Sequence, residues 1–208
     1  MGHLIGTAIE SILNQTYKNL ELIIVDDFST DTTLSIAKEY AQKDSRVRVI
    51  EGKDDPNRVN KALKRNINAG FAAKNVGFEI AKGEYITIQD SDDASLLNRI
   101  EVQYELIKKY SAVLITTGYK EFEEALVGTT YEGPLPPPTM GKEEIYKLSQ
   151  STKGIVAKIS TALNRMIPFT VKRWRGVNKL FWGSLKPHPG ASGVAFFSRK
   201  LIDDGIRF

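Results

Sequence analysis

Two groups of aspartates have the residue types and spacing to bind a cation or a polar ligand. Asp90, Asp92 and Asp93 fall within four consecutive positions, and Asp26 and Asp27 are adjacent earlier in the chain. Carboxylates this close together repel one another, and hard divalent cations take carboxylate oxygens as ligands. The later group therefore predicts a Mg²⁺ or Mn²⁺ site. The alternative is a solvated acidic turn that caps the following helix.

Each aspartate group follows a segment that predicts a strand. Residues 20–25 form a nearly continuous apolar run, typical of a strand buried on both faces of a parallel sheet, and residues 85–89 alternate into a second strand. In an open α/β sheet, ligands bind outside the carboxyl ends of the strands. We therefore expect both groups to face one crevice.

The rest of the pattern alternates helices with strands. Apolar residues at helical spacing predict four helices, with Gly83 as the stop of the third. The expected helices cover residues 4–13, 34–41, 73–81 and 97–107, and further strands are expected at 47–50, 113–117 and 194–198. The alternation predicts an α/β fold with a doubly wound, mostly parallel sheet and helices on both faces. The polar, basic segment 52–68 is interpreted as a functional loop.

Composition sets broad limits. A chain of 208 residues with 41% hydrophobic content suits one α/β domain over residues 1–208. The absence of cysteine excludes a disulfide framework, a thiolate metal site and a cysteine nucleophile. No apolar run approaches the roughly 18 to 20 residues that span a bilayer. We expect a cytoplasmic protein.

The net charge of +4 is unevenly placed. Residues Lys172 to Lys186 carry five cations and no acid, with Trp174 and Trp182 among them. This segment predicts either ordinary packing of the aromatics or a peripheral contact with a phosphate-bearing acceptor or a lipid-linked sugar at a membrane surface. Nucleic acid is not expected as the partner.

Two blocks of sequence carry a family resemblance. Residues 11–31, SILNQTYKNLELIIVDDFSTD, and residues 68–93, NAGFAAKNVGFEIAKGEYITIQDSDD, resemble the inverting glycosyltransferases of family 2 in order and spacing. The resemblance covers about residues 6–107, and GASGVAFFSRKLI is similar to a later strand and helix of the family. It implies a GT-A fold, with a nucleotide-sugar-binding half at 1–118 and an acceptor-side half at 119–208.

The family's chemistry implies a nucleoside-diphosphate-sugar donor, a Mn²⁺ or Mg²⁺ ion, and a carbohydrate, glycolipid or glycoprotein acceptor. By this resemblance Asp27 accepts a hydrogen bond from the nucleobase and Asp26 supports it. Asp90 contacts the ribose or the metal, Asp92 binds the metal, and Asp93 is a weaker candidate for either role.

Four cationic or imidazole groups extend the expected site. Lys74 stands where the family often has arginine, and as a point charge it would neutralise phosphate or reach the nucleoside, unless it is a solvated helix residue. Lys64 and Arg65 fall in a loop where some relatives contact the base. His188 is either a further metal ligand or a surface loop residue.

The sequence also departs from the family. Relatives begin with an apolar strand that lies inside the sheet, and they carry a catalytic Asp or Glu beyond the part matched here, so we expect a fragment of a longer protein. The catalytic base is unassigned. Asp203 and Asp204 are the last acids and are interpreted as helix residues, with a role as base as the alternative.

Two other functions remain open at this point. One is a sugar nucleotidyltransferase, although the Gly-rich basic phosphate loop that usually marks that class is not visible. The other is a non-catalytic module that binds a sugar nucleotide or a polyanion through its basic segment.

Overall fold

The computed structural model describes residues 1–52, 59–60, 65–66, 70–118, 124–135, 143, 166–168, 171 and 195–205. The chain divides into two compact units, one of Met1–Leu135 with Gly190–Phe208 and one of Pro136–Pro189. Almost all described residues belong to the first unit, and the elements below are those of that unit. A single domain over the whole chain stays a prediction.

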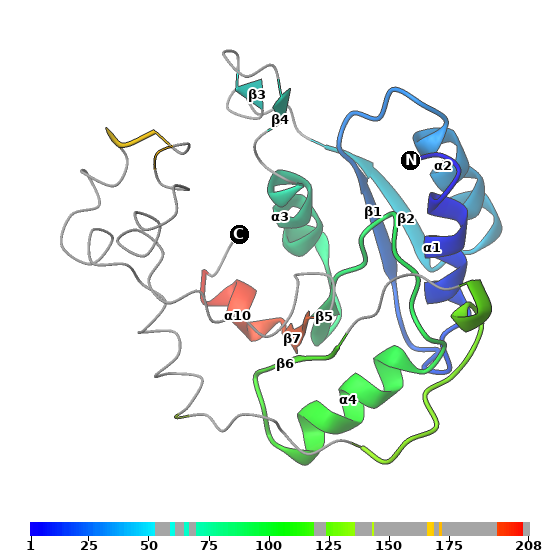
Figure 1. Ribbon diagram of the computed structural model, residues 1–208, viewed down its shortest axis with the longest axis vertical. Coiled ribbons are helices and arrows are strands. Elements are labelled where there is room, and N and C mark those ends of the chain that lie inside the picture. The colour runs from blue at the N-terminus through cyan, green and yellow to red at the C-terminus, as the bar shows by residue number, and fades with distance from the viewer. Residues whose placement is uncertain are drawn as a thin grey trace. The chain divides into compact units, whose positions relative to one another are not determined.

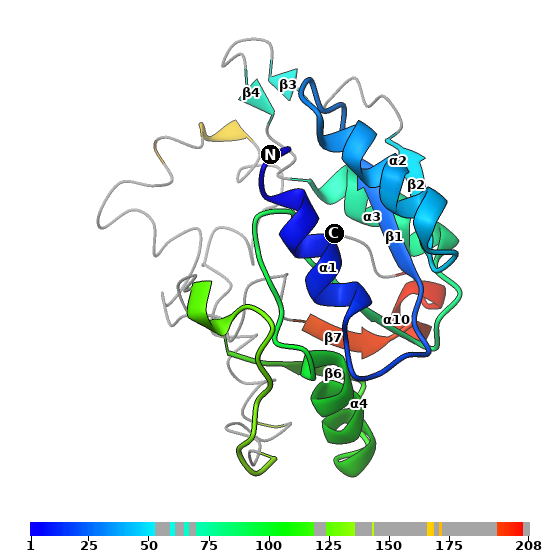
Figure 2. The same cartoon turned by 90° about the vertical axis from the view of Figure 1, so that its right-hand side faces the viewer.

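A parallel strand pair forms the first layer. Strand β1 (Leu22–Asp26) pairs with β2 (Val47–Glu51), and helix α2 (Thr33–Lys43) makes the connection that parallel strands require. Helix α1 (Ile5–Leu13) lies beside α2, as Figure 2 shows. Ile9 of α1 and Ala37 of α2 belong to one apolar cluster, against which Ile24 of β1 packs.

Helix α3 (Phe71–Ile80) contacts β1 as well, through Val25. A Cβ on Gly77 would lie 3.6 Å from Val25 Cγ2, an ordinary van der Waals distance, so this turn of α3 packs directly on Val25. Because successive side chains of a strand point to opposite faces, Ile24 and Val25 meet helices on both sides. This part of the predicted architecture, with helices on both faces, is confirmed.

A second layer is a small antiparallel sheet. Strands β5 (Tyr85–Thr87), β7 (Ala195–Ser198) and β6 (Leu114–Thr116) lie in the order β5-β7-β6 (Figure 1). Helix α4 (Arg99–Lys109) packs against one face through Ile100 and Ile107.

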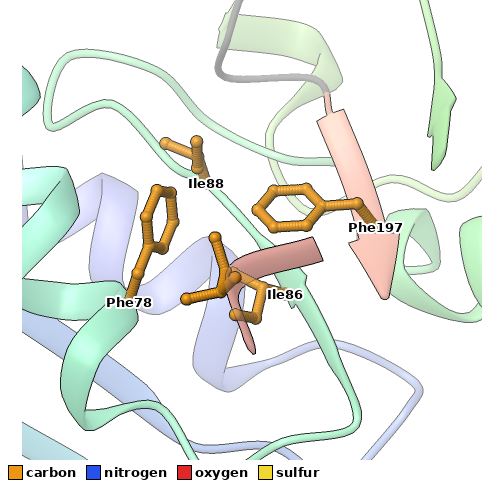
Figure 3. Close-up of a cluster of buried hydrophobic side chains, with 5 residues drawn as sticks. Phe78, Ile86, Ile88 and Phe197 are labelled. Atoms are coloured by element: carbon orange, nitrogen blue, oxygen red, sulfur yellow. The ribbon is translucent and has the colours of Figure 1, made fainter. Parts of the chain in front are cut away.

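The other face of this sheet packs against α3 and the short helix α10 (Lys200–Asp203). Figure 3 shows the cluster, in which Phe78 of α3 faces Ile86, Ile88 and Phe197 from the strand side. The rings of Phe78 and Phe197 meet edge to face, with centroids 5.7 Å apart. Their burial fixes α3, which carries Lys74, against the sheet whose strand β5 leads to Asp90.

The expected alternation of helices and strands is confirmed, but the described strands do not form one mostly parallel sheet. They form the parallel pair, the antiparallel three-stranded sheet, and a hairpin of β3 (Val59–Asn60) with β4 (Arg65–Asn66). In the described part of the chain β1 pairs only with β2 and β5 only with β7. Within these residues one edge of each strand thus has no partner strand, and both strands line the same cleft.

The described chain that follows β6 adds one 3-10 turn, Glu124–Leu126. The carbonyl of Thr129 accepts a hydrogen bond from the Leu97 amide, and Asn98 bonds the backbone of Tyr131. Within the described ranges, no helix combines the length and the apolarity that crossing a bilayer would take.

Candidate functional site

The carboxyl ends of β1 and β5 open onto one cleft of about 930 Å³. Asp26 and Asp27 from the end of β1, Lys74 from α3, and Asp90 from the end of β5 all line it. Apolar residues of α1, β1 and β5 line the remainder, including Ile5, Ile9, Val25 and Ile86. The structure therefore brings Asp26, Asp27 and Asp90 to one crevice, as the strand-end argument predicts, whereas Asp92 and Asp93 are not among the residues that line it.

Asp26 is the buried member of its pair. It is 6% exposed, and its Oδ2 accepts a hydrogen bond from the Ser29 amide at 3.2 Å. Its Oδ1 is shielded from solvent and has no hydrogen-bond partner in the described part of the chain. A buried carboxylate oxygen without a donor is costly, so it is suited to receive one from a ligand.

Gly52 holds the end of β2 tightly against these aspartates. Its amide donates to the Asp26 carbonyl at 2.8 Å. A Cβ at position 52 would lie 2.9 Å from that carbonyl oxygen and 3.7 Å from Asp27 Oδ1. The close approach of β2 therefore needs glycine and helps to set where the half-buried Asp27 lies.

Asp90 to Asp93 form a tight loop at the end of β5, the acidic turn. The Asp93 amide donates to the Asp90 carbonyl at 3.2 Å, and Gln89 Nε2 donates to the same carbonyl at 3.2 Å. Ser95 Oγ donates to Gln89 Oε1 at 2.6 Å, and this bond links the residues before and after the turn. These local hydrogen bonds contribute to the shape of the turn.

The electrostatics of the acidic turn fit a cation. Desolvation raises the pKa of Asp93, and the charges of Asp92 and Asp90 raise it further. Among the residues the structure describes, no three carboxylate, histidine or cysteine side chains converge as a ready-made metal cage. Mg²⁺ is usually held by only one or two carboxylates, with phosphates and water completing its shell. Asp92 and Asp93, both exposed, match that mode.

Lys74 is the cation of the cleft that the sequence predicted. Its side chain is only 16% exposed, and its Nζ lies 3.3 Å from Asp90 Oδ1. The pair joins α3 to the acidic turn, and both residues line the cleft. A lysine held here is placed to meet the phosphates of a ligand that enters between the two strands.

The structure does not bring the remaining candidates to the cleft. Asp203 is exposed and its Oδ2 lies 3.9 Å from Arg199 Nε, while Asp204 caps the end of α10, and neither lines the cleft. Arg65 is in β4, paired with Asn60, and its side chain is not among those described. The other candidates lie outside the described residues: Lys64, His188, and the segment Lys172 to Lys186.

One residue of the cleft is missed by the sequence analysis. Arg99, the first residue of α4, lines the cleft, and its Nη1 donates to Thr87 Oγ1 at 3.2 Å and to the Ile88 carbonyl at 3.3 Å. Burial lowers its pKa to about 10, with the charge of Asp93 acting in the opposite direction. Helical spacing is the signal that could have found it, because Arg99 stands four residues before the fully buried Gln103 on the same helix face.

The chain is similar in sequence to bacterial glycosyltransferases. The chain is 37% identical to the glycosyltransferase GlyG of Streptococcus pneumoniae over 124 residues, which cover 60% of this chain and 37% of GlyG. It is 40% identical to the putative glycosyltransferase EpsE of Bacillus subtilis over 122 residues, covering 58% of this chain and 40% of EpsE. The chain thus spans less than half the length of these relatives.

The fold has a counterpart among solved structures. The crystal structure of S. aureus TarS 1-349 in complex with UDP matches with a TM-score of 0.53 and 18% identity, over 99% of this chain and 46% of TarS. The family model described as glycosyl transferase family 2 matches residues 2–168, a stretch that contains both strand ends and the acidic turn. The chain therefore belongs to glycosyl transferase family 2.

Proposed function

We propose that this chain forms the donor-binding part of a glycosyltransferase. It would take a sugar from a nucleoside-diphosphate sugar and pass it, with inversion and with Mn²⁺ or Mg²⁺, to a hydroxyl of a carbohydrate, glycolipid or glycoprotein. The observation that carries the proposal is the convergence of Asp26, Asp27, Lys74 and Asp90 on one cleft, in a chain of this family.

Each end of the cleft has a role. The family resemblance gives the nucleobase hydrogen bond to Asp27 with Asp26 in support. We assign it instead to the buried Asp26 Oδ1, with Asp27 beside it, because this oxygen needs a donor that the described part of the protein does not provide. Lys74 meets the diphosphate as a point charge. Asp92 and Asp93, which lie on the same turn as the cleft-lining Asp90, would hold the metal ion, and the ion would stabilise the negative charge that develops on the departing nucleoside diphosphate.

Transfer with inversion is a single displacement. The acceptor oxygen bonds to the anomeric carbon while the bond from that carbon to the diphosphate oxygen breaks, and a base takes the acceptor proton. The protein's part on the donor side is to orient the diphosphate and stabilise it as it leaves. Neither Asp203 nor Asp204 lines the cleft, so we assign the base to neither of them.

The test is titration calorimetry of the 208-residue chain with uridine diphosphate, the nucleotide in the TarS complex. We expect binding in Mn²⁺ that weakens by about tenfold or more when the metal is chelated. Asp92→Asn should cause the same loss with stability within about 0.5 kcal/mol of the parent, because the side chain is exposed. Asp204→Asn, at the end of α10 and off the cleft, is the control.

The outcome that overturns the proposal is an absence of binding for the uridine, guanosine, adenosine and thymidine diphosphates alike, with either metal. Binding that is equally tight with and without metal would keep the donor site but reject the metal role of the acidic turn.

A further inference from the structure

Arg99 is a half-buried cation at the proposed site. It lines the cleft, and its Nε and Nη2 are shielded from solvent. Withdrawing a guanidinium from water is expensive, so its place in the fold needs a compensating role. The contacts of its Nη1 indicate that role.

Nη1 of Arg99 bonds the chain at the point where it leaves β5. It donates to the carbonyl of Ile88, two residues before Asp90, and to the hydroxyl of Thr87, the last residue of the strand. That hydroxyl in turn donates to the Ala195 carbonyl of β7 at 2.8 Å. Arg99 therefore fastens the base of the acidic turn to the three-stranded sheet.

The far side of the turn is fastened independently. The Ser95 hydroxyl donates to Gln89 Oε1 on the other side of the turn, and the Ser95 amide donates to Ser11 Oγ of α1 at 3.1 Å. Arg99 adds what these neutral groups lack, a fixed positive charge held at the base of the turn that carries the aspartates. Three adjacent carboxylates can then stay close together before a cation arrives.

We propose that Arg99 is a positioning residue: it holds the acidic turn in the shape that receives the metal and the diphosphate, and it acts through the turn rather than on the ligand. This inference rests on the proposed function, because it assigns Arg99 to the same site. Groups that orient metal ligands typically change metal affinity or activity by about 10- to 100-fold when they are removed.

The test compares Arg99→Gln with the parent in two measurements. Hydrogen exchange of residues 88–95 without ligand reports the order of the turn, and calorimetry with Mn²⁺ and uridine diphosphate reports the site. We expect faster exchange confined to the turn and binding weakened by about 10-fold or more. Arg99→Lys keeps the charge but loses the planar set of guanidinium donors. Its exchange rate in the turn and its affinity should fall between those of Arg99→Gln and the parent.

Two further variants separate positioning from a general loss of stability. Thr87→Val removes one acceptor of Arg99 and should shift both readouts in the same direction by less. Arg46→Gln is the matched control, because Arg46 also bonds a backbone carbonyl, that of Leu13, and lies off the cleft. It should lower stability without altering the turn or the binding. If Arg99→Gln does not fold, Thr87→Val and Arg99→Lys decide by the same two readouts.

Several results would reject the inference. Simple electrostatics predicts tighter cation binding once a nearby positive charge is gone, so a gain in Mn²⁺ affinity in Arg99→Gln would overturn positioning, as would unchanged exchange in the turn. Uniformly faster exchange across α1, α2 and α4 would show a merely structural role. If the parent binds no nucleotide, the proposed function fails. The hydrogen-exchange measurement still tests whether Arg99 orders the acidic turn.

Discussion

Lys74 Nζ lies 3.3 Å from Asp90 Oδ1, and this ion pair bridges α3 and the acidic turn. The lysine is mostly buried and the aspartate is 39% exposed, so solvent screens the pair only in part. A metal ion bound at the turn would compete for Asp90. Lys74 would then be free to move toward the phosphates. In the absence of a ligand, the Asp90 carboxylate therefore occupies the place beside Lys74 that a phosphate would take.

Replacing Lys74 should therefore affect the ligand more than the fold. We expect Lys74→Met to weaken the binding of uridine diphosphate by about tenfold, the loss of one charge-assisted contact, and Lys74→Arg to retain it. The control is Lys38→Met, since Lys38 is exposed and pairs with Glu51 at 3.2 Å on the surface. Calorimetry with Mn²⁺ measures both. Equal affinities in Lys74→Met and Lys38→Met would exclude the assigned role.

Asp26→Asn tests whether a buried charge is kept for binding at the expense of stability. The amide costs less to bury than a carboxylate, so the urea midpoint should stay unchanged or rise. The affinity for uridine diphosphate should fall by about tenfold, because an amide N–H would then meet the N–H of the base. Asp204→Asn serves again as the exposed control.

A result in which Asp26→Asn binds as tightly as the parent would remove Asp26 from the nucleobase role. A large loss of stability would show instead that its carboxylate is structural, through the bond from the Ser29 amide.

The local elements could be predicted because their signals are local. The strand expected at 47–50 is Val47–Glu51, and the helix expected at 97–107 is Arg99–Lys109. The strand expected at 85–89 stops at Thr87, and the Ile88 carbonyl accepts a hydrogen bond from Arg99. No apolar pattern around residue 88 announces that an arginine 11 positions later takes this carbonyl.

The order and direction of the strands could not be predicted from local sequence patterns. β7 enters between β5 and β6, and Thr87 bonds Ala195 across 108 positions of sequence. Such a pairing depends on tertiary packing, in which Phe196 and Phe197 bury opposite faces of the sheet. The alternation of a strand does not say whether its partner runs parallel or antiparallel.

The candidate site was largely predictable from the rule that ligands meet strand carboxyl ends. What the rule left open was which aspartate of the first pair is buried. Asp26 shares the parity of Leu22 and Ile24, whose side chains pack with the α1 and α2 cluster, and it is the buried one. Because α3 covers the opposite face at Val25, the alternation of β1 alone could not have told the two aspartates apart.

Gly52→Ala should disturb the site from outside it. The added Cβ would lie 2.9 Å from the Asp26 carbonyl, a backbone atom that cannot move without shifting Asp27. We expect a loss of about 1 to 3 kcal/mol in the free energy of unfolding, together with weaker nucleotide binding. Gly118→Ala is the matched control, because a Cβ at position 118 would have no atom of the described residues within 4 Å. Urea denaturation of the two variants side by side checks this, and equal stabilities would contradict it.

The stability of the protein at acidic pH should depend on Asp44. The side-chain hydrogen bond from Arg46 lowers the pKa of Asp44 to about 2, with the Arg46 amide contributing as well. Because the folded pKa is depressed, the ionised carboxylate stabilises the protein above the unfolded value of about 4, and this contribution is lost as the pH falls toward 2. The urea midpoints of the parent and Asp44→Asn should therefore differ near neutral pH and converge in acid. Parallel curves over that range would show that the Asp44–Arg46 pair does not contribute to stability.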